Sequence, residues 1–263
     1  MIFEWNGARM YYEVQGETGA PLTLLHGWGG SHESMGPLQR DLAEKRRILT
    51  VDFPGHGESS EPPEPWEVTQ YTEITCALME REGFRGSDVI AHSFGGRVTL
   101  LMAATRPELV NRLLLTGCAG LPNRPSGKRS AKTYLYKGLR AAADNSLTRA
   151  VFRDQVDVWR EKLIQKFGSA DYRALTPSMR QTFNRVIAQD LTECLGKIRA
   201  STLLVWGEND TATPIWMGET MEREIADAAL IRFEGATHFA YLEQYPRFLA
   251  IAREFLKETG GNR

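Results

Sequence analysis

A serine lies between a short apolar run and a helical pattern, where its hydroxyl could act as a nucleophile. The segment reads Ala91-His92-Ser93-Phe94-Gly95. Such a hydroxyl attacks a carbonyl carbon when a base takes its proton and the backbone presents its oxygen. A sharp turn from strand to helix does this, and it needs small residues two positions before and after the serine. Ala91, which departs from the usual glycine, and Gly95 satisfy this need. The pattern predicts Ser93 as nucleophile, and the alternative is a serine that merely caps a helix.

The general base is predicted from the order of residues along the chain. A nucleophile on this kind of turn is followed by its acid and then by its histidine. The chain contains five histidines, and four of them precede Ser93 or adjoin it. The fifth, His238, lies in the segment Gly235-Ala236-Thr237-His238-Phe239, between an expected strand and the last expected helix. We therefore expect His238 to be the base.

An acid that orients the base is expected in the loop Gly207-Glu208-Asn209-Asp210. A carboxylate there can accept the Nδ1 proton of a histidine, which fixes the tautomer and stabilises the imidazolium. Asp210 is favoured for this role, with Glu208 in the same loop as the alternative. The turn at 116–120 contains no carboxylate and supplies no candidate.

Two glycine-containing loops complete the motif set. An oxyanion needs backbone N–H groups that point at it, and glycines let a loop approach closely. The loop His26-Gly27-Trp28-Gly29-Gly30 follows an expected strand, so the N–H groups of Trp28 and Phe94 are the expected donors. An ordinary turn is the alternative. We expect His26 to brace this loop, and the segment 52–59, Asp-Phe-Pro-Gly-His-Gly-Glu-Ser, to form a rigid structural turn.

These motifs follow short apolar runs that alternate with helical patterns. Strands are expected at 2–6, 9–14, 22–25, 48–51, 88–91, 112–116, 202–206 and 230–233, and helices near 34–45, 70–82, 95–105 and 246–258. Asn6-Gly7 is typical of a tight hairpin between the first two strands. The alternation that follows predicts an α/β fold with a parallel sheet, whose strand ends would carry the site.

The segment 119–197 interrupts this alternation with helical periodicity. We expect a helical cap there, inserted into a core formed by 1–118 and 198–263. The cap segment has 15 Lys and Arg against seven Asp and Glu, whereas the rest has 17 against 26. A solvated outer face explains this charge most simply. Alternatively, Arg124, Lys128, Arg129 and Lys132 line the cleft and attract an anionic substrate.

Composition excludes several classes of protein. The chain has 263 residues and a formal net charge of −1, so no strong field draws it to nucleic acid or anionic lipid. The sequence lacks a secretory signal pattern and an apolar run of bilayer-spanning length, so we expect a cytoplasmic protein without a membrane partner. The three cysteines are widely spaced, as free thiols in a reducing compartment would be.

Taken together, the motifs around Ser93, Asp210 and His238, with the two glycine-containing loops, resemble the α/β-hydrolase superfamily. That resemblance implies a mostly parallel eight-stranded sheet flanked by helices, with a helical cap after the sixth strand. It also implies an acyl-enzyme mechanism without a cofactor. A serine at position 93 argues against the dehalogenase and epoxide hydrolase branches, which use aspartate there. Hydrolysis of a small-molecule carboxylic ester is the leading expectation. The alternatives are carbon–carbon bond hydrolysis of a diketone-like acid and a ligand-binding protein that retains the triad.

Overall fold

A computed structural model describes residues 1–122 and 170–257 of the chain. Its eight strands form one sheet in the order β1-β2-β4-β3-β5-β6-β7-β8. The strands are β1 (Ile2–Trp5), β2 (Ala8–Gln15), β3 (Pro21–Leu25), β4 (Arg47–Val51), β5 (Ser87–His92), β6 (Val110–Thr116), β7 (Ser201–Gly207) and β8 (Ala228–Phe233). Each expected strand is therefore present.

Strand directions follow from the connections. Asn6 and Gly7 have φ values of 46° and 80°, the left-handed conformation that a two-residue hairpin turn requires. They join β1 and β2 as an antiparallel pair, and β2 also runs antiparallel to β4. All other neighbours are parallel because a helix or a longer crossover returns the chain to the same end of the sheet. The predicted mostly parallel eight-stranded sheet is confirmed.

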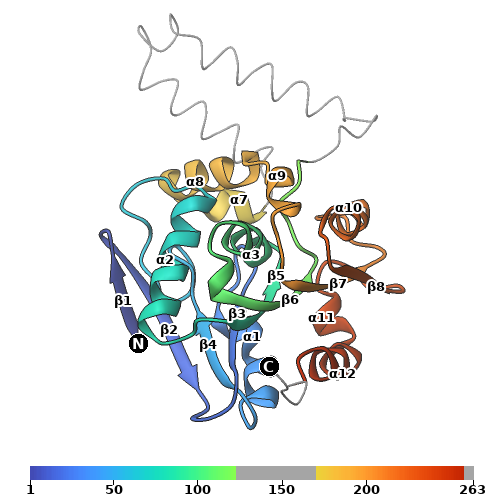
Figure 1. Ribbon diagram of the computed structural model, residues 1–263. Coiled ribbons are helices and arrows are strands. Elements are labelled where there is room, and N and C mark those ends of the chain that lie inside the picture. The colour runs from blue at the N-terminus through green and yellow to red at the C-terminus, as the bar shows by residue number, and fades with distance from the viewer. Residues whose placement is uncertain (123–169, 258–263) are drawn as a thin grey trace, which may run out of the picture. The chain divides into compact units, whose positions relative to one another are not determined.

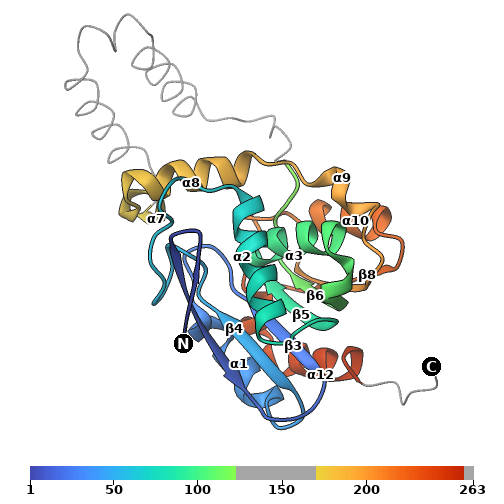
Figure 2. The same cartoon turned by 60° about the vertical axis from the view of Figure 1, so that its left-hand side comes forward.

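Helices cover both faces of the sheet (Figures 1 and 2). The helices of the described residues are α1 (His32–Leu42), α2 (Val68–Arg81), α3 (Phe94–Thr105), η1 (Pro107–Leu109), α7 (Ala170–Ala174), α8 (Pro177–Ala188), α9 (Thr192–Leu195), α10 (Trp216–Glu224), α11 (Ala240–Glu243) and α12 (Tyr245–Phe255). Buried residues of α2, α3 and α10 belong to one hydrophobic cluster, and those of α1, α11 and α12 belong to a second. The sheet thus separates two cores, which is why its central strands are apolar on both faces.

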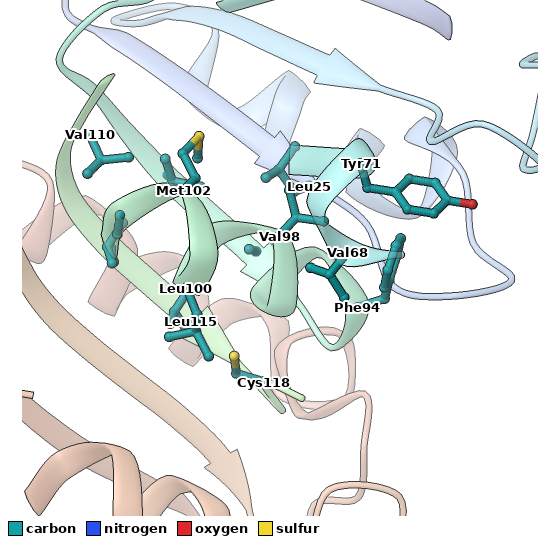
Figure 3. Packing of buried hydrophobic residues seen from close by; sticks show 14 of the residues in the cluster. Leu25, Val68, Tyr71, Phe94, Val98, Leu100, Met102, Val110, Leu115 and Cys118 are labelled. Carbon is teal, nitrogen blue, oxygen red and sulfur yellow. The ribbon is translucent and has the colours of Figure 1, made fainter. Parts of the chain in front are cut away.

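The helix that follows Ser93 is embedded in the first of these cores. Val98 and Leu100 on α3 are fully buried, and Figure 3 shows them among side chains from β3, α2 and β6. Phe94 at the start of the helix packs against Tyr71 of α2, with ring centroids 5.0 Å apart. The start of α3 is therefore fixed by packing from several directions.

The chain divides into two compact units, Met1–Pro122 with Gln181–Arg263, and Asn123–Arg180. The expected cap at 119–197 overlaps the second unit, but residues 123–169 lie outside the described part, so the extent of the cap stays a prediction. Arg124, Lys128, Arg129 and Lys132 also lie outside the described residues. Within the described part, 170–195 contains helices α7, α8 and α9, as the periodicity predicted.

No helix in the described ranges is long and apolar enough to cross a bilayer. The three cysteines are free, as expected. Cys76 and Cys118 are buried, and burial raises the pKa of the Cys76 thiol to about 12.

Candidate functional site

Ser93 lies at the junction of β5 and α3, in a backbone conformation that few residues adopt. Its φ is 50° and its ψ is −105°, and such strain is retained where surrounding contacts impose it. The Ser93 N–H donates to the carbonyl of Thr116 at 3.1 Å, and its own carbonyl accepts from Ala119 at 3.1 Å. These contacts come from the last residue of β6 and from the turn after it, so the neighbouring strand and its turn hold Ser93.

Close packing explains the small residues around the serine. A Cβ on Gly95 would lie 2.4 Å from the carbonyl oxygen of Leu25, so a larger residue would displace the end of β3. The N–H of Gly95 instead donates to the His26 carbonyl at 3.0 Å. Ala91, on the other side, is completely buried in β5. The local sequence therefore fits the sharp turn that it predicted.

The structure brings Ser93, His238 and Asp210 into one chain of hydrogen bonds. The Oγ of Ser93 lies 2.9 Å from Nε2 of His238, and Nδ1 of His238 lies 2.8 Å from Oδ2 of Asp210. With Asp210 ionised, Nδ1 carries the ring proton and Nε2 is free to accept the serine proton. The predicted nucleophile, base and orienting acid thus stand within direct reach of one another.

Glu208, the alternative acid, does not take this place. It is exposed at the end of β7, whereas the side chain of Asp210 is fully buried against His238. The N–H of Glu208 donates to Phe233 at 3.1 Å, and this bond aligns the loop with the end of β8. The distance to His238 therefore favours Asp210 over Glu208.

Hydrogen bonds surround the Asp210 carboxylate. Its Oδ1 accepts the N–H groups of Ala212 and Thr213, each at 2.8 Å, and its Oδ2 contacts the Thr213 hydroxyl at 2.8 Å. Burial alone would raise the pKa of this carboxyl, but the bonds from His238 and Thr213 outweigh it and lower the pKa below its usual value. Asp210 therefore stays ionised at neutral pH.

The loop that carries His238 is tied to the acid loop and to the next helix. The N–H of Asn209 donates to the Ala236 carbonyl at 2.9 Å. The N–H of Thr237 donates to a carboxylate oxygen of Glu243 at 2.8 Å. These bonds flank His238 on its N-terminal side, so the ring is held by backbone as well as by Asp210.

His92, which precedes the nucleophile, is a contact that the sequence reasoning missed. Its Nε2 lies 3.0 Å from the carbonyl oxygen of His238, and its ring centroid lies 4.7 Å from that of His238. Burial, aided by the nearby His238, lowers the pKa of His92 to about 3. His92 is thus a neutral imidazole that links β5 to the base loop without competing for the proton.

The expected oxyanion donors lie beside the serine. A Cβ on Gly27 would lie 3.3 Å from Cβ of Ser93, which places the loop after β3 against the nucleophile. Within the described residues, no hydrogen bond occupies the backbone N–H of Trp28 or Phe94. Their role as oxyanion donors stays a prediction.

His26 and the turn at 52–59 support this loop, as expected. Nδ1 of His26 donates to the Gly27 carbonyl at 2.7 Å, and its Nε2 accepts the Phe53 N–H at 3.0 Å. Asp52 is fully buried and accepts the N–H of Glu58 at 2.8 Å. The two segments are thus joined through buried polar contacts, and their structural role is confirmed.

Aromatic side chains gather around the same loop. Trp28 is partly buried, and its ring lies 5.3 Å from Phe94 and 5.1 Å from Phe183 of α8. Phe239, which follows His238, is 50% exposed and packs 5.1 Å from the ring of His92. The sequence did not single out Phe183, because its contact with Trp28 depends on tertiary packing between segments far apart in the chain.

Comparison with known proteins places these features in a wider group. The chain is 29% identical over 241 residues to the dihydrolipoyllysine-residue acetyltransferase component of an acetoin cleaving system from Pseudomonas putida, covering 89% of this chain and 62% of that protein. The chain thus spans less than two thirds of that relative. It is 27% identical to a pimeloyl-[acyl-carrier protein] methyl ester esterase from Neisseria meningitidis over 89% of this chain and 92% of that one. It is 26% identical to a 2-hydroxymuconate semialdehyde hydrolase from Pseudomonas putida over 96% and 92%, respectively.

A solved structure and a family profile agree with the observed fold. The structure of MGS-M2, an alpha/beta hydrolase from a Medee basin deep-sea metagenome library, superposes with a TM-score of 0.76 at 19% identity, covering 100% of this chain and 99% of that chain. The profile described as the alpha/beta hydrolase family matches residues 24–252, from the strand before the Gly27 loop to the last helix. The chain belongs to the alpha/beta hydrolase family.

Proposed function

We propose that this hydrolase cleaves small-molecule carboxylic esters through a covalent acyl-enzyme on Ser93. In this proposal His238 is the general base, Asp210 orients it, and the N–H groups of Trp28 and Phe94 bind the oxyanion. The observation that carries the proposal is the unbroken contact from Ser93 Oγ through the His238 ring to the buried Asp210 carboxylate, at 2.9 and 2.8 Å.

Acylation follows from these positions. His238 Nε2 takes the proton of the Ser93 hydroxyl as the oxygen attacks the ester carbonyl carbon. The carbonyl oxygen becomes negative and accepts the N–H groups of Trp28 and Phe94, where removal of one such donor typically costs about 10²–10³ in kcat. The ester C–O bond then breaks, and the leaving alkoxide receives the proton from His238. Asp210 stabilises the transient imidazolium throughout.

Deacylation reverses the roles of the two oxygens. A water molecule takes the position of the departed alcohol and gives a proton to His238 as it attacks the acyl carbon. The bond to Ser93 Oγ breaks, and the serine recovers the proton from His238. The net reaction consumes one ester and one water and yields one acid and one alcohol, so this chemistry requires no cofactor.

The test is turnover and labelling at Ser93. The wild-type protein should hydrolyse a p-nitrophenyl ester with an initial burst, and a fluorophosphonate probe should label Ser93. The Ser93→Ala variant should lose both properties while its circular dichroism spectrum stays unchanged. Labelling without turnover on any ester would favour the alternative of a ligand-binding protein. Labelling that persists in the variant would refute the assignment of the nucleophile.

Carbon–carbon bond hydrolysis is a second candidate, because a hydrolase named for 2-hydroxymuconate semialdehyde is similar to this chain over nearly its whole length. The same serine and histidine could serve that reaction. A panel that contains methyl and p-nitrophenyl esters beside a diketone-like acid separates the two candidates. A kcat/KM at least tenfold higher on the diketone-like acid would replace the ester proposal.

A further inference from the structure

Thr213 contacts both members of the acid–base pair. Its Oγ1 lies 2.8 Å from Oδ2 of Asp210 and 3.3 Å from Nδ1 of His238. The same oxygen lies 3.0 Å from the carbonyl oxygen of Gly117 at the end of β6. Thr213 is only 4% exposed, so water does not replace these contacts.

The Thr213 hydroxyl has three polar neighbours but only one proton. A hydroxyl has one hydrogen to donate, and a charged acceptor forms the stronger bond. The carboxylate of Asp210 is charged and is also the nearer acceptor, so the hydroxyl donates to Oδ2 rather than to the Gly117 carbonyl. A lone pair of Oγ1 then faces the Nδ1–H of His238 as a second, longer acceptor.

Gly117 closes the remaining side of this arrangement. Its φ is 49°, and a Cβ there would lie 3.2 Å from Nδ1 of His238 and 3.3 Å from Oδ2 of Asp210. The Asp210 carboxylate and the His238 ring thus lie between the Gly117 backbone and the Thr213 hydroxyl. A side chain at position 117 would therefore crowd both groups.

We propose that Thr213 is a positioning residue, whose hydroxyl holds the Asp210 carboxylate in place and shares the Nδ1 proton of His238. This inference rests on the proposed function, because it concerns the same acid–base pair. The backbone N–H of Thr213 donates to Oδ1 of Asp210, and the Thr213 hydroxyl is the group that holds Oδ2 of the same carboxylate.

Removing the hydroxyl has a defined electrostatic consequence. In Thr213→Val the carboxylate loses one donor, and more of its negative charge is directed to the His238 proton. The Nδ1–H of His238 loses its second acceptor at the same time, so the side chain no longer fixes either partner. The other groups that face this ring are His92, which is neutral, and the Ser93 hydroxyl, while Glu243 reaches the loop through Thr237. None of these groups changes in the variant.

The experiment measures the rate of fluorophosphonate labelling at Ser93 between pH 5 and 9, with kcat/KM on a p-nitrophenyl ester beside it. We expect Thr213→Val to react about tenfold more slowly at neutral pH, which is the effect of about one hydrogen bond, and to have a pH profile that differs from that of wild type. Thr213→Ser keeps the hydroxyl and should restore both the rate and the pH profile to near wild type.

Thr75→Val is the matched control. Thr75 is a fully buried threonine of α2 whose hydroxyl donates to the Tyr71 carbonyl at 2.7 Å, away from the site. It should lose comparable stability without moving the pH profile. Superimposable profiles for wild type and Thr213→Val, with Ser93 labelled in both, would refute this inference alone. Absence of labelling at Ser93 in the wild type would refute the proposed function and this inference together.

Discussion

The substitution Asp210→Asn exchanges one carboxylate oxygen for an amide nitrogen. The surrounding hydrogen bonds decide which of the two oxygens is replaced. Oδ1 of Asp210 accepts two backbone N–H groups, from Ala212 and Thr213, so the remaining oxygen must stay there. The amide NH₂ is then placed at the Oδ2 position, 2.8 Å from Nδ1 of His238. Two donors cannot face each other, so the imidazole must move its proton to Nε2.

That tautomer cannot accept the proton of Ser93. The wrong tautomer costs about 10⁴-fold in kcat where such an exchange has been made in a Ser-His-Asp site. A factor of this size corresponds to roughly 5 kcal/mol of lost transition-state stabilisation. We therefore expect Asp210→Asn to retain its fold and to lose about four orders of magnitude in kcat on a p-nitrophenyl ester.

Glu208→Gln is the control, because it makes the same chemical change on an exposed residue of the same loop. Its kcat should stay within about twofold of wild type, as surface changes away from buried contacts usually have small effects. Steady-state kinetics at pH 7–8 on both variants, with thermal melts to verify folding, give the comparison. A larger loss in Glu208→Gln than in Asp210→Asn would refute the assignment and transfer the role to Glu208.

Three further predictions concern other parts of the protein. Ser93→Gly should melt at a higher temperature than Ser93→Ala, since glycine relieves the strain at φ 50°, worth about 1–3 kcal/mol, and equal melting points would contradict this. Burial lowers the pKa of the His92 imidazole to about 3 in the folded chain. In the unfolded chain this imidazole has its usual pKa of 6.5, so it takes up a proton below pH 6.5 that the folded chain does not bind. Stability should consequently fall from pH 6.5 towards pH 3, and the urea midpoint of His92→Gln should fall less steeply over that interval than that of wild type. If basic residues of the segment 119–197 face the cleft, an ester bearing a free carboxylate should have a higher kcat/KM at low salt than its neutral counterpart. Arg129→Gln or Lys132→Gln should weaken that preference, and equal rates for both esters at low salt would show that the charge faces solvent.

The sequence was sufficient for features that depend on local residues. Asn6-Gly7 predicts its hairpin because few dipeptides adopt left-handed conformations, and the small residues around Ser93 predict a turn that larger ones could not make. Helix α10 was missed because it begins at Trp216 without a polar cap, after a loop that reads as irregular. Its inner face contributes Met217 and Met221 to the core, which only tertiary packing reveals.

Contacts between distant segments could not be predicted in the same way. The choice between Asp210 and Glu208 depends on which carboxylate the parallel pairing of β7 and β8 turns toward the histidine. The His92 contact and the Thr213 hydroxyl depend on the same pairing, extended through β6. A one-residue change of register would reverse the faces of these strands, so the order of residues alone leaves such contacts open.

The bond between Ser93 and His238 joins residues 145 positions apart, and this separation has a kinetic consequence. Among the described residues, strand β8 lies at the edge of the sheet and pairs with β7 alone. Non-local parallel pairing forms slowly because the chain entropy of the closed loop must be lost first. During refolding, helical circular dichroism should therefore recover before Ser93 becomes reactive towards a fluorophosphonate. The appearance of that reactivity would report when the last strand joins the sheet.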